Sequence, residues 1–162
     1  MTELILSLGS NINADHNIRS ALRLLEDVFG GLELSSVYES ESVGFSGDNF
    51  LNLVAIVVAE YELAFVNETL KSIEDRLGRD RSAEKFSSRP IDIDILVFGD
   101  SDGKECGIEL PRAEILQNAF VLRPLAELRP NSIHAQTGQT YSDLWSDYDH
   151  SLQKLWPINF IR

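Results

Sequence analysis

Two aspartates alternate with isoleucines in the most strand-like segment of the sequence, Ile91-Asp92-Ile93-Asp94-Ile95. Because successive side chains of a β-strand point to opposite faces, Asp92 and Asp94 would share one face, with Cα atoms about 7 Å apart at a rise of roughly 3.3 Å per residue. Two carboxylates at that spacing can converge on a hard cation. Mg²⁺ suits them because it takes few protein oxygens and completes its octahedron with phosphate oxygens and water. The alternative is a half-exposed strand whose acids are merely solvated.

Basic residues gather just before this segment, in a chain that is otherwise acidic. The formal net charge of −12 disfavours general binding to nucleic acid or to an anionic membrane. The local exception is a cluster made of Arg76, Arg79, Arg81, Lys85 and Arg89. Arginine binds phosphate oxygens through two parallel hydrogen bonds, so this cluster suits a small anionic ligand. Its position next to the aspartates favours a site that binds a metal ion together with phosphate groups.

The elements that must position these residues follow from the apolar periodicity of the chain. We expect strand, helix, strand, strand, helix and strand, in that order, over residues 4–8, 18–29, 32–40, 50–59, 63–77 and 91–98. This order predicts an α+β fold with a ferredoxin-like βαββαβ core, in which helices pack against an antiparallel sheet. Residues 99–162 are expected to add a C-terminal helical extension, with helices near 118–128 and from about Tyr141.

Length and composition limit the class of protein. A chain of 162 residues with 43% hydrophobic composition predicts one domain over residues 1–162. No signal peptide or membrane span is recognised near the first residues, which predicts a cytoplasmic protein. The single cysteine, Cys106, cannot form an internal disulfide, and the three histidines lack metal-ligand spacing, so zinc chemistry is not expected. The expected partners are small-molecule substrates, with the chain a monomer or a weak homo-oligomer.

The segments Gly78-Arg79-Asp80-Arg81 and Arg89-Pro90-Ile91-Asp92-Ile93-Asp94-Ile95-Leu96-Val97-Phe98-Gly99 closely resemble the signature of the 6-hydroxymethyl-7,8-dihydropterin pyrophosphokinases. Three further segments, Leu8-Gly9-Ser10-Asn11, Phe50-Leu51-Asn52 and Ala119-Phe120-Val121-Leu122, are similar to that family's first turn, pterin segment and late helix. The resemblance covers nearly the whole chain. It implies a magnesium-dependent enzyme of folate synthesis that transfers pyrophosphate from ATP to the hydroxymethyl group of a dihydropterin and releases AMP.

The resemblance implies a role for each residue that matches the family's phosphate side. Two Mg²⁺ ions would be held by Asp92 and Asp94, and these aspartates would form the catalytic set together with Arg79, Arg81 and Arg89. The nucleotide-binding residues would be Glu74, Arg79, Arg81, Arg89, Ile95 and Arg112. The segment from Arg79 to Pro90 is expected to close when both substrates are bound.

The resemblance likewise implies a pterin side, made of Ser40, Val43, Phe50, Asn52 and Phe120. Phe50 and Phe120 match two rings that sandwich the heterocycle, and Asn52 matches the amide that reads its hydrogen-bonding edge. These residue types suit a flat heterocycle, which stacks on aromatic faces and needs both a donor and an acceptor. Ordinary core packing is the alternative for the two phenylalanines. A buried amide in an apolar strand, in contrast, has to be satisfied.

Three positions depart from the family pattern. Phe86-Ser87-Ser88 stands where the family usually has Trp-Gly-Pro, Arg112 where it commonly has histidine, and Asn118 where it commonly has arginine. The pterin side therefore keeps the pattern better than the nucleotide side. Two alternatives follow: a divergent paralogue that binds a pterin-like heterocycle with weak or altered activity, and a ferredoxin-like interaction module without enzymatic activity.

Overall fold

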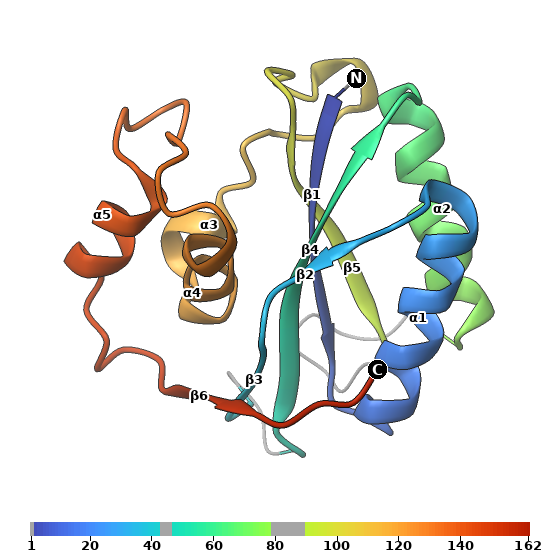
Figure 1. Cartoon of the computed structure of the whole chain (residues 1–162), viewed down its shortest axis with the longest axis horizontal. Helices are drawn as coiled ribbons and strands as arrows, with labels where there is room; N and C mark the ends of the chain where they lie inside the picture. The colour runs from blue at the N-terminus through green and yellow to red at the C-terminus, as the bar shows by residue number, and fades with distance from the viewer. Residues whose placement is uncertain (1, 43–46, 79–89) are drawn as a thin grey trace.

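The computed structural model describes residues 2–42, 47–78 and 90–162, apart from the side chain of Ala59. A six-stranded sheet runs through the centre of this described part (Figure 1). The strands of its main path are, in order, β5 (Asp92–Phe98), β1 (Thr2–Ser10), β4 (Phe50–Ala59), β3 (Val37–Ser40) and β6 (Leu155–Ile158). A short strand, β2 (Glu33–Leu34), also pairs with β4, and all these pairings are antiparallel. β1 therefore lies between β4 and β5 and controls how their residues align.

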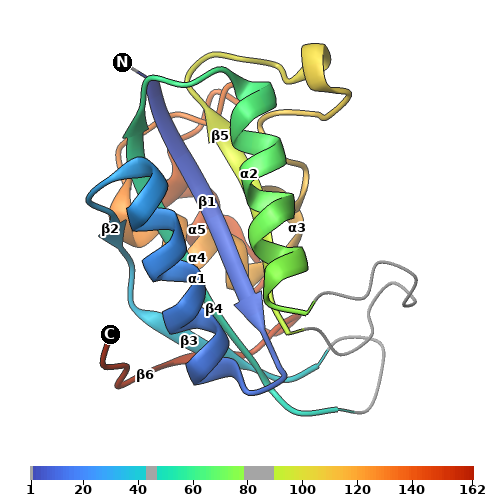
Figure 2. The ribbon, with the colours of Figure 1, turned by 90° about the vertical axis from the view of Figure 1, so that its right-hand side faces the viewer.

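Two helices make the crossovers of the core. α1 (Ala14–Phe29) connects β1 to β2, and α2 (Leu63–Arg76) connects β4 to β5. Both helices pack on the same face of the sheet (Figure 2). Together with the strand order β5-β1-β4-β3, this confirms the predicted α+β fold and its ferredoxin-like βαββαβ core.

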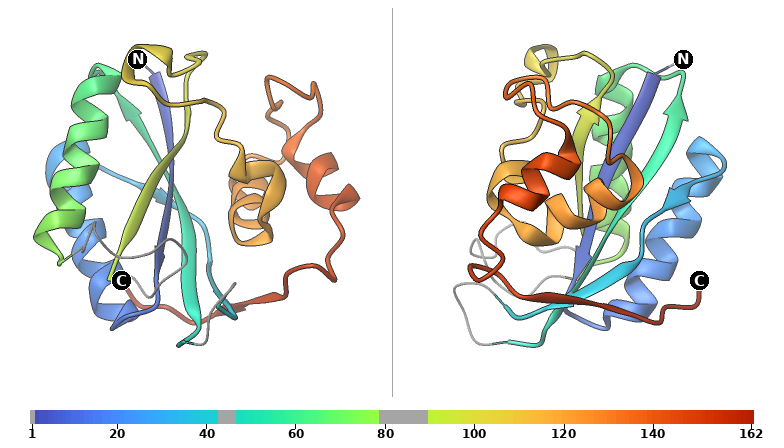
Figure 3. Two further views of the ribbon diagram at one scale, coloured as in Figure 1. Left: turned by 180° about the vertical axis from the view of Figure 1, so that it is seen from behind. Right: turned by 60° about the vertical axis from the view of Figure 1, so that its left-hand side comes forward.

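The last three helices of the C-terminal extension cover the opposite face of the sheet (Figure 3). A short 3-10 helix, η1 (Lys104–Cys106), precedes α3 (Glu114–Gln117), α4 (Ala119–Leu128) and α5 (Tyr141–Asp147). The helices predicted near residues 118–128 and from Tyr141 are thus confirmed. The sheet is the middle of three layers (Figure 1). None of the helices in the described part of the chain has the length and apolar character needed to span a membrane.

Strand alternation divides the central strands between two cores. Leu4 and Leu6 lie in the core beneath α1 and α2, whereas Ile5 between them lies in the core beneath α4. β4 is divided in the same way, with Leu53 on the first side and Val54 on the second. Each fully buried side chain of this kind contributes roughly 1.5–3 kcal/mol. Because both faces are covered, a polar side chain within these strands needs a hydrogen-bond partner inside the molecule or on a ligand.

The strand predicted over residues 32–40 is interrupted at Ser35. The backbone N–H of Ser35 donates to the Val54 carbonyl at 2.9 Å, but the N–H of Val54 donates to the side-chain Oγ of Ser35, also at 2.9 Å. A hydroxyl oxygen thus replaces a backbone carbonyl in the ladder, which interrupts the regular pairing with β4 at the point between β2 and β3.

β6 is a strand that the apolar periodicity does not predict. Its four residues include Pro157, and proline is excluded from the interior of a sheet because it has no N–H to donate. The segment forms a strand here because it lies at the edge, where it pairs Val37 with Ile158 and Ser40 with Leu155. Tertiary pairing therefore overrides the weak local signal.

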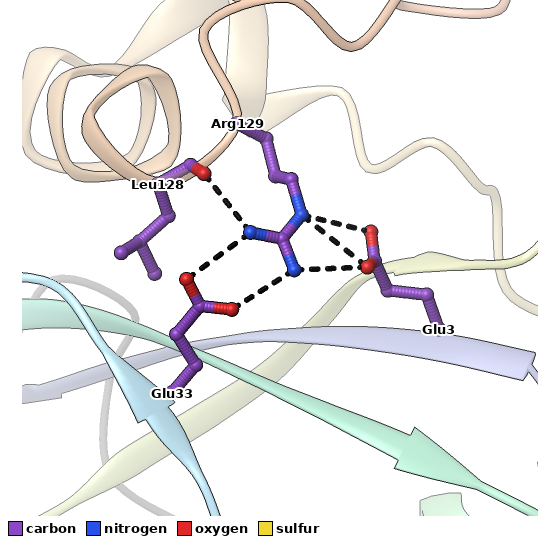
Figure 4. Close-up of polar contacts among 4 residues, drawn as sticks. All are labelled: Glu3, Glu33, Leu128 and Arg129. Atoms are coloured by element: carbon purple, nitrogen blue, oxygen red, sulfur yellow. Dashed lines mark hydrogen bonds and ion pairs between the residues drawn. The ribbon is translucent and has the colours of Figure 1, made fainter.

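Arg129 fastens the end of α4 to two strands (Figure 4). Its Nη2 lies 3.0 Å from Glu3 Oε2 on β1 and 2.9 Å from Glu33 Oε1 on β2. Its Nη1 also donates to the carbonyl of Leu128 at 3.0 Å. Two carboxylates and a helix carbonyl thus orient one guanidinium, which ties the C-terminal end of α4 to the sheet.

Removing this contact should have a modest effect on stability. The substitution Arg129→Met should lower the free energy of unfolding by about 1 kcal/mol, because the partners are partly exposed. Urea unfolding at low and high salt should show that the loss shrinks with salt. Lys104→Met is the matched control, since the Lys104–Asp102 pair is 3.7 Å long and largely exposed. Equal stability of the two variants would contradict a specific role for Arg129.

Candidate active site

β1 places Gly9 between polar residues of its two neighbouring strands. Gly9 pairs with Asn52 of β4 on one side and with Asp92 of β5 on the other. Because directly opposed residues of antiparallel strands share a face, these three residues form a row across the sheet, which we call the polar row. Ser7, two residues earlier on β1, pairs with Asp94. Both aspartates therefore lie on the face that carries Asn52.

The polar row is on the side of the sheet that α4 covers. Val54 lies two residues beyond Asn52 and belongs to the core beneath α4, so both side chains point to that side. The predicted alternation on β5 is confirmed, because Ile91, Ile93 and Ile95 lie in the opposite core. Ile95 is only 4% exposed, so its side chain faces away from the aspartates and from the polar row.

Gly9 leaves the space that the Asn52 side chain occupies. A Cβ atom on Gly9 would lie 2.5 Å from Asn52 Nδ2. Asn52 is 6% exposed, and its Oδ1 is a buried acceptor without a hydrogen-bond partner among the described residues. Such an acceptor costs about 1–3 kcal/mol, so its presence here indicates a role outside stability. Sequence reasoning singled out Asn52 but missed this role of Gly9, although a glycine inside an apolar strand signals a close approach.

The carboxyl group of Asp94 lies in an environment that opposes its ionisation. Burial and then the charge of Asp92 raise the pKa of Asp94 to about 7, although Arg112 acts in the opposite direction. Arg112 Nη2 lies 3.5 Å from Asp94 Oδ1 and 3.1 Å from Glu114 Oε1. The backbone N–H of Arg112 donates to the Leu96 carbonyl at 2.9 Å, which fixes the arginine beside β5. One guanidinium thus offsets only part of the negative charge around Asp94.

Glu74 reaches β5 from α2, on the other side of the sheet. It is 5% exposed, and its Oε2 accepts a hydrogen bond from the backbone N–H of Ile93 at 2.8 Å. Because β5 is an edge strand, a side chain satisfies this donor in place of a neighbouring strand. Ile93 stands between the two aspartates, so Glu74 holds the backbone that presents them. Its nucleotide-binding role stays a prediction.

Ser40 and Phe50 lie on the sheet face that carries Asn52, and Phe120 lies on α4, the helix that covers this face. Ser40 pairs with Phe50, which precedes Asn52 by two residues and therefore shares its face. Ser40 is 5% exposed, and both phenylalanines are partly buried. Phe120 lies in the first turn of α4 and packs against the core beneath that helix. The structure thus brings four of the predicted pterin-side residues to one side of the sheet.

The turn after β1 holds two distant segments at this end of the sheet. The hydroxyl of Ser10 donates to the carbonyl of Pro90, and Asn11 Nδ2 donates to the carbonyl of Asp48 at 3.2 Å. Ser10 and Asn11 are both buried. This turn, which resembles the family's first turn, therefore holds the segments that precede β4 and β5. Both segments lie at the end of the sheet that carries the polar row.

Four predicted site residues lie outside the described residues: Val43, Arg79, Arg81 and Arg89. The segment Phe86-Ser87-Ser88 and the expected closure of residues 79–90 also depend on that part of the chain. These assignments stay predictions.

Asn118, one of the departures from the family pattern, supports the start of α4. Its Oδ1 accepts a hydrogen bond from Gln153 Nε2 at 2.9 Å, and Gln153 Oε1 accepts one from the N–H of Ala119 at 2.8 Å. The first N–H groups of a helix lack partners within the helix, so this amide pair satisfies one of them. The helix that carries Phe120 is thereby fixed at its N-terminal end.

Known proteins share both the sequence pattern and the arrangement. A family model described as 7,8-dihydro-6-hydroxymethylpterin-pyrophosphokinase (HPPK) matches residues 5–130. The 2-amino-4-hydroxy-6-hydroxymethyldihydropteridine pyrophosphokinase of Porphyromonas gingivalis is 36% identical over 138 residues, which cover 80% of this chain and 92% of the relative. The protein of that name from Aquifex aeolicus is 32% identical over 136 residues, which cover 83% of this chain and 84% of the relative.

Longer proteins contain a similar region. The folate synthesis bifunctional protein of Arabidopsis thaliana is 33% identical over 131 residues, and the match covers 78% of this chain but 27% of that protein. A crystal structure of Plasmodium falciparum HPPK-DHPS has the same fold, with a TM-score of 0.71 at 17% identity over 91% of this chain and 44% of that chain. This chain thus spans less than half of these longer proteins. The matched residues 5–130 include the polar row, both aspartates and α4, and the chain belongs to the 7,8-dihydro-6-hydroxymethylpterin-pyrophosphokinase family.

Proposed function

We propose that this protein transfers the terminal pyrophosphoryl group of ATP to 6-hydroxymethyl-7,8-dihydropterin, giving AMP and the pterin diphosphate. The family match and the Porphyromonas gingivalis relative, of which this chain covers 92%, support this reaction. The observation that carries the proposal is the buried amide oxygen of Asn52, which has no hydrogen-bond partner within residues 2–42, 47–78 and 90–162 and shares a sheet face with Asp92 and Asp94. An acceptor for a heterocycle and a pair of acids for a metal ion thus lie side by side.

Asn52 would read the hydrogen-bonding edge of the pterin. Its Oδ1 would accept from a ring N–H or the amino group, and its Nδ2 is available in the same plane for an acceptor on the ring. Phe50 and Phe120 supply aromatic surfaces on the same side of the sheet, on which a flat ring stacks favourably. Gly9 makes this possible because it has no side chain in the space that the Asn52 amide occupies.

Asp92 and Asp94 would hold magnesium. The raised pKa of Asp94, caused first by burial and then by the charge of Asp92, fits this assignment, because a cation at these carboxylates would favour their ionised form. The described residues contain no group of three or more His, Cys, Asp or Glu suited to a metal ion. This also fits Mg²⁺, which is commonly held by one or two carboxylates together with substrate phosphates. When bound, the two proposed ions would neutralise charge on the phosphate oxygens.

The chain's own residues would act mainly by positioning. The hydroxymethyl oxygen attacks the β-phosphorus and its proton passes to water, while the bond from that phosphorus to the oxygen shared with the α-phosphate breaks and AMP leaves with that oxygen. The sheet holds the pterin through Asn52 and the phosphates near Asp92, so that the reacting atoms meet without a covalent protein intermediate. Arg112, together with Arg79, Arg81 and Arg89, would stabilise the charge on the transferred group.

We infer that the protein is cytoplasmic and that residues 1–162 form one domain, which carries the whole proposed site. Both cores use opposite faces of β1 and β4, which supports a single folding unit. The only cysteine of the chain has no internal partner for a disulfide, which is compatible with a reducing compartment.

A divergent paralogue is the second candidate, and Arg112 is the observation that favours it. Its guanidinium lies beside Asp94, where it competes with a cation for the same carboxylate. The direct test of both candidates is to incubate the pure protein with ATP, Mg²⁺ and 6-hydroxymethyl-7,8-dihydropterin. We expect AMP and pterin diphosphate in equal amounts. Pterin binding without AMP would favour the paralogue, and binding of neither substrate would contradict both candidates.

Asp94→Asn should stabilise the protein in the absence of metal. The pKa of Asp94 is about 7 in the folded protein against an ordinary value of 3.8, so the folded state binds more protons between these pH values. Stability therefore falls as the pH rises from about 4 to about 7, and a neutral side chain avoids this loss. We expect a gain of about 1–2 kcal/mol at pH 8 and little at pH 4, from urea unfolding.

Magnesium should reverse the stability difference, because it should stabilise the unmodified protein more than the Asp94→Asn variant. Added Mg²⁺ and ATP should raise the melting temperature of the unmodified protein but not of Asp94→Asn. The matched control is Asp27→Asn on the exposed side of α1, which should behave as the unmodified protein in both experiments. A metal response that survives Asp94→Asn would remove Asp94 from the metal site.

Asn52→Ala should weaken pterin binding by about 1–3 kcal/mol, because the edge of the ring loses its partner. The same substitution should cost little stability, since it removes an acceptor that has no partner among the described residues. Gly9→Ala should also weaken pterin binding, because its Cβ displaces the Asn52 amide. Fluorescence titration measures the affinity of each variant.

Asn17→Ala provides the control for these two variants. The buried Asn17 amide donates to the Ile12 carbonyl at 2.6 Å, on α1 and away from the polar row. Its loss should lower stability and leave pterin affinity unchanged. Asn52 would return to a purely structural role if Asn52→Ala behaved in the same way as Asn17→Ala.

A further inference from the structure

Glu127 joins α4 to β3 through three hydrogen bonds. Its Oε1 accepts from the hydroxyl of Tyr38 at 2.7 Å. Its Oε2 accepts from the backbone N–H of Ser36 at 2.8 Å and from the Ser36 hydroxyl at 3.2 Å. We call these three residues the β3–α4 clasp. Both oxygens of one carboxylate are used, so the clasp fixes the direction as well as the distance between helix and strand.

The clasp lies directly beside the proposed pterin side. Tyr38 is opposite Asn52 in the pairing of β3 with β4, so the two side chains are neighbours on the face that α4 covers. Tyr38 is 5% exposed. On α4, Glu127 follows Phe120 by seven residues, which is close to two helical turns, so both project from the same side of the helix. The clasp therefore ties the C-terminal turn of α4, which lies two turns from Phe120 on the same side of the helix, to the strand next to Asn52.

Arg123 holds the tyrosine ring from another direction. Its guanidinium carbon lies 4.8 Å from the centroid of the Tyr38 ring and 5.9 Å from that of Trp145. Its Nη1 donates to the carbonyl of Leu155 in β6 at 3.3 Å. Burial and then the bond to Glu127 raise the pKa of Tyr38 to about 12, so the hydroxyl remains a donor at all working pH values. The Tyr38 hydroxyl can therefore donate its hydrogen bond to Glu127 throughout this pH range.

A pterin between two aromatic faces needs those faces at a fixed separation. Carbon atoms in contact are about 3.5–4.0 Å apart, so a ring stacked on both sides requires roughly 7 Å between its two partners. In this protein one aromatic residue, Phe50, belongs to β4, and the other, Phe120, belongs to α4. Their separation therefore depends on how α4 sits above the sheet.

We propose that Tyr38 and Glu127 are positioning residues for the pterin pocket, which fix the separation of Phe120 on α4 from Phe50 and Asn52 on β4. This inference rests on the proposed function, because it takes a pterin as the occupant. Neither residue needs to touch the pterin for this role. The Arg129 contact ties the same C-terminal end of α4 to β1 and β2 and provides a comparison in which the helix is held without a contact to Tyr38 of β3.

The test uses Tyr38→Phe and Glu127→Gln in the full chain. Tyr38→Phe keeps the ring and its contact with Arg123 and removes only the hydroxyl, so the variant should fold. We expect the Kd for the pterin, from fluorescence titration, to rise about tenfold in each variant, because a packed pocket tolerates little displacement. The KM for the pterin should rise with it, whereas the Kd for Mg²⁺ and ATP and the value of kcat should stay within about twofold.

Two further variants separate positioning from stability. Arg129→Met should lose comparable thermal stability without any change in pterin affinity, because it leaves the contact between α4 and Tyr38, the strand neighbour of Asn52, in place. The double variant Tyr38→Phe/Glu127→Gln should bind the pterin as weakly as Glu127→Gln alone, since the two residues share one hydrogen bond.

Each outcome has a distinct meaning. Variants that lose stability but bind the pterin as the unmodified protein does would overturn the positioning role and leave the proposed function intact. A rise in the Kd for Mg²⁺ and ATP equal to that for the pterin would also overturn it, because the effect would then be general. An unmodified protein that binds no pterin would overturn the proposed function and this inference together.

Discussion

The antiparallel register of β1 with β4 and β5 is the constraint on which the rest of the site depends. It sets Asn52, Gly9 and Asp92 in one row, and Asp94 next to Ser7 on the same face. Neighbouring strands lie about 4.8 Å apart, so the row places the amide proposed to bind the pterin and a carboxylate proposed to bind the metal ion roughly 10 Å from each other. A shift of one residue in either pairing would turn one of these groups to the opposite face.

The two cores explain why this end of the sheet can carry polar groups that cost stability. Leucines and isoleucines on the face beneath α1 and α2 supply apolar burial along the whole of β1, and that face contains Ile93 and Ile95 between and after the aspartates. The apolar core of the other face lies around Ile5 and Val54. Beyond it lie the Asn52 Oδ1, which has no partner in the described part of the chain, and a carboxyl whose pKa is raised. Ligands that satisfy both groups would recover part of the stability lost there.

Local patterns in the sequence predict a large part of this arrangement, and non-local contacts account for what they miss. The period of two in residues 91–95 predicts that the aspartates share a face, and the order of elements predicts the ferredoxin-like core. The close approach of Gly9 to Asn52 depends on register between strands far apart in the sequence, which no local pattern contains. The same holds for β6, which is a strand only because β3 offers an edge, and for Arg112, whose contact with Asp94 requires the chain to return beside β5.

In the proposed site the metal ion and the pterin bind side by side on the polar row. Manganese, which prefers the same oxygen ligands, can replace magnesium and strongly relaxes nearby protons. NMR relaxation of the bound pterin should therefore be measured with Mn²⁺ and an ATP analogue that is not hydrolysed. We expect Mn²⁺ to enhance strongly the relaxation rate of the bound pterin protons. Asp94→Asn should abolish this enhancement without releasing the pterin. A bound pterin whose relaxation is unaffected by Mn²⁺ would contradict this arrangement, because the two ligands would then occupy separate parts of the molecule.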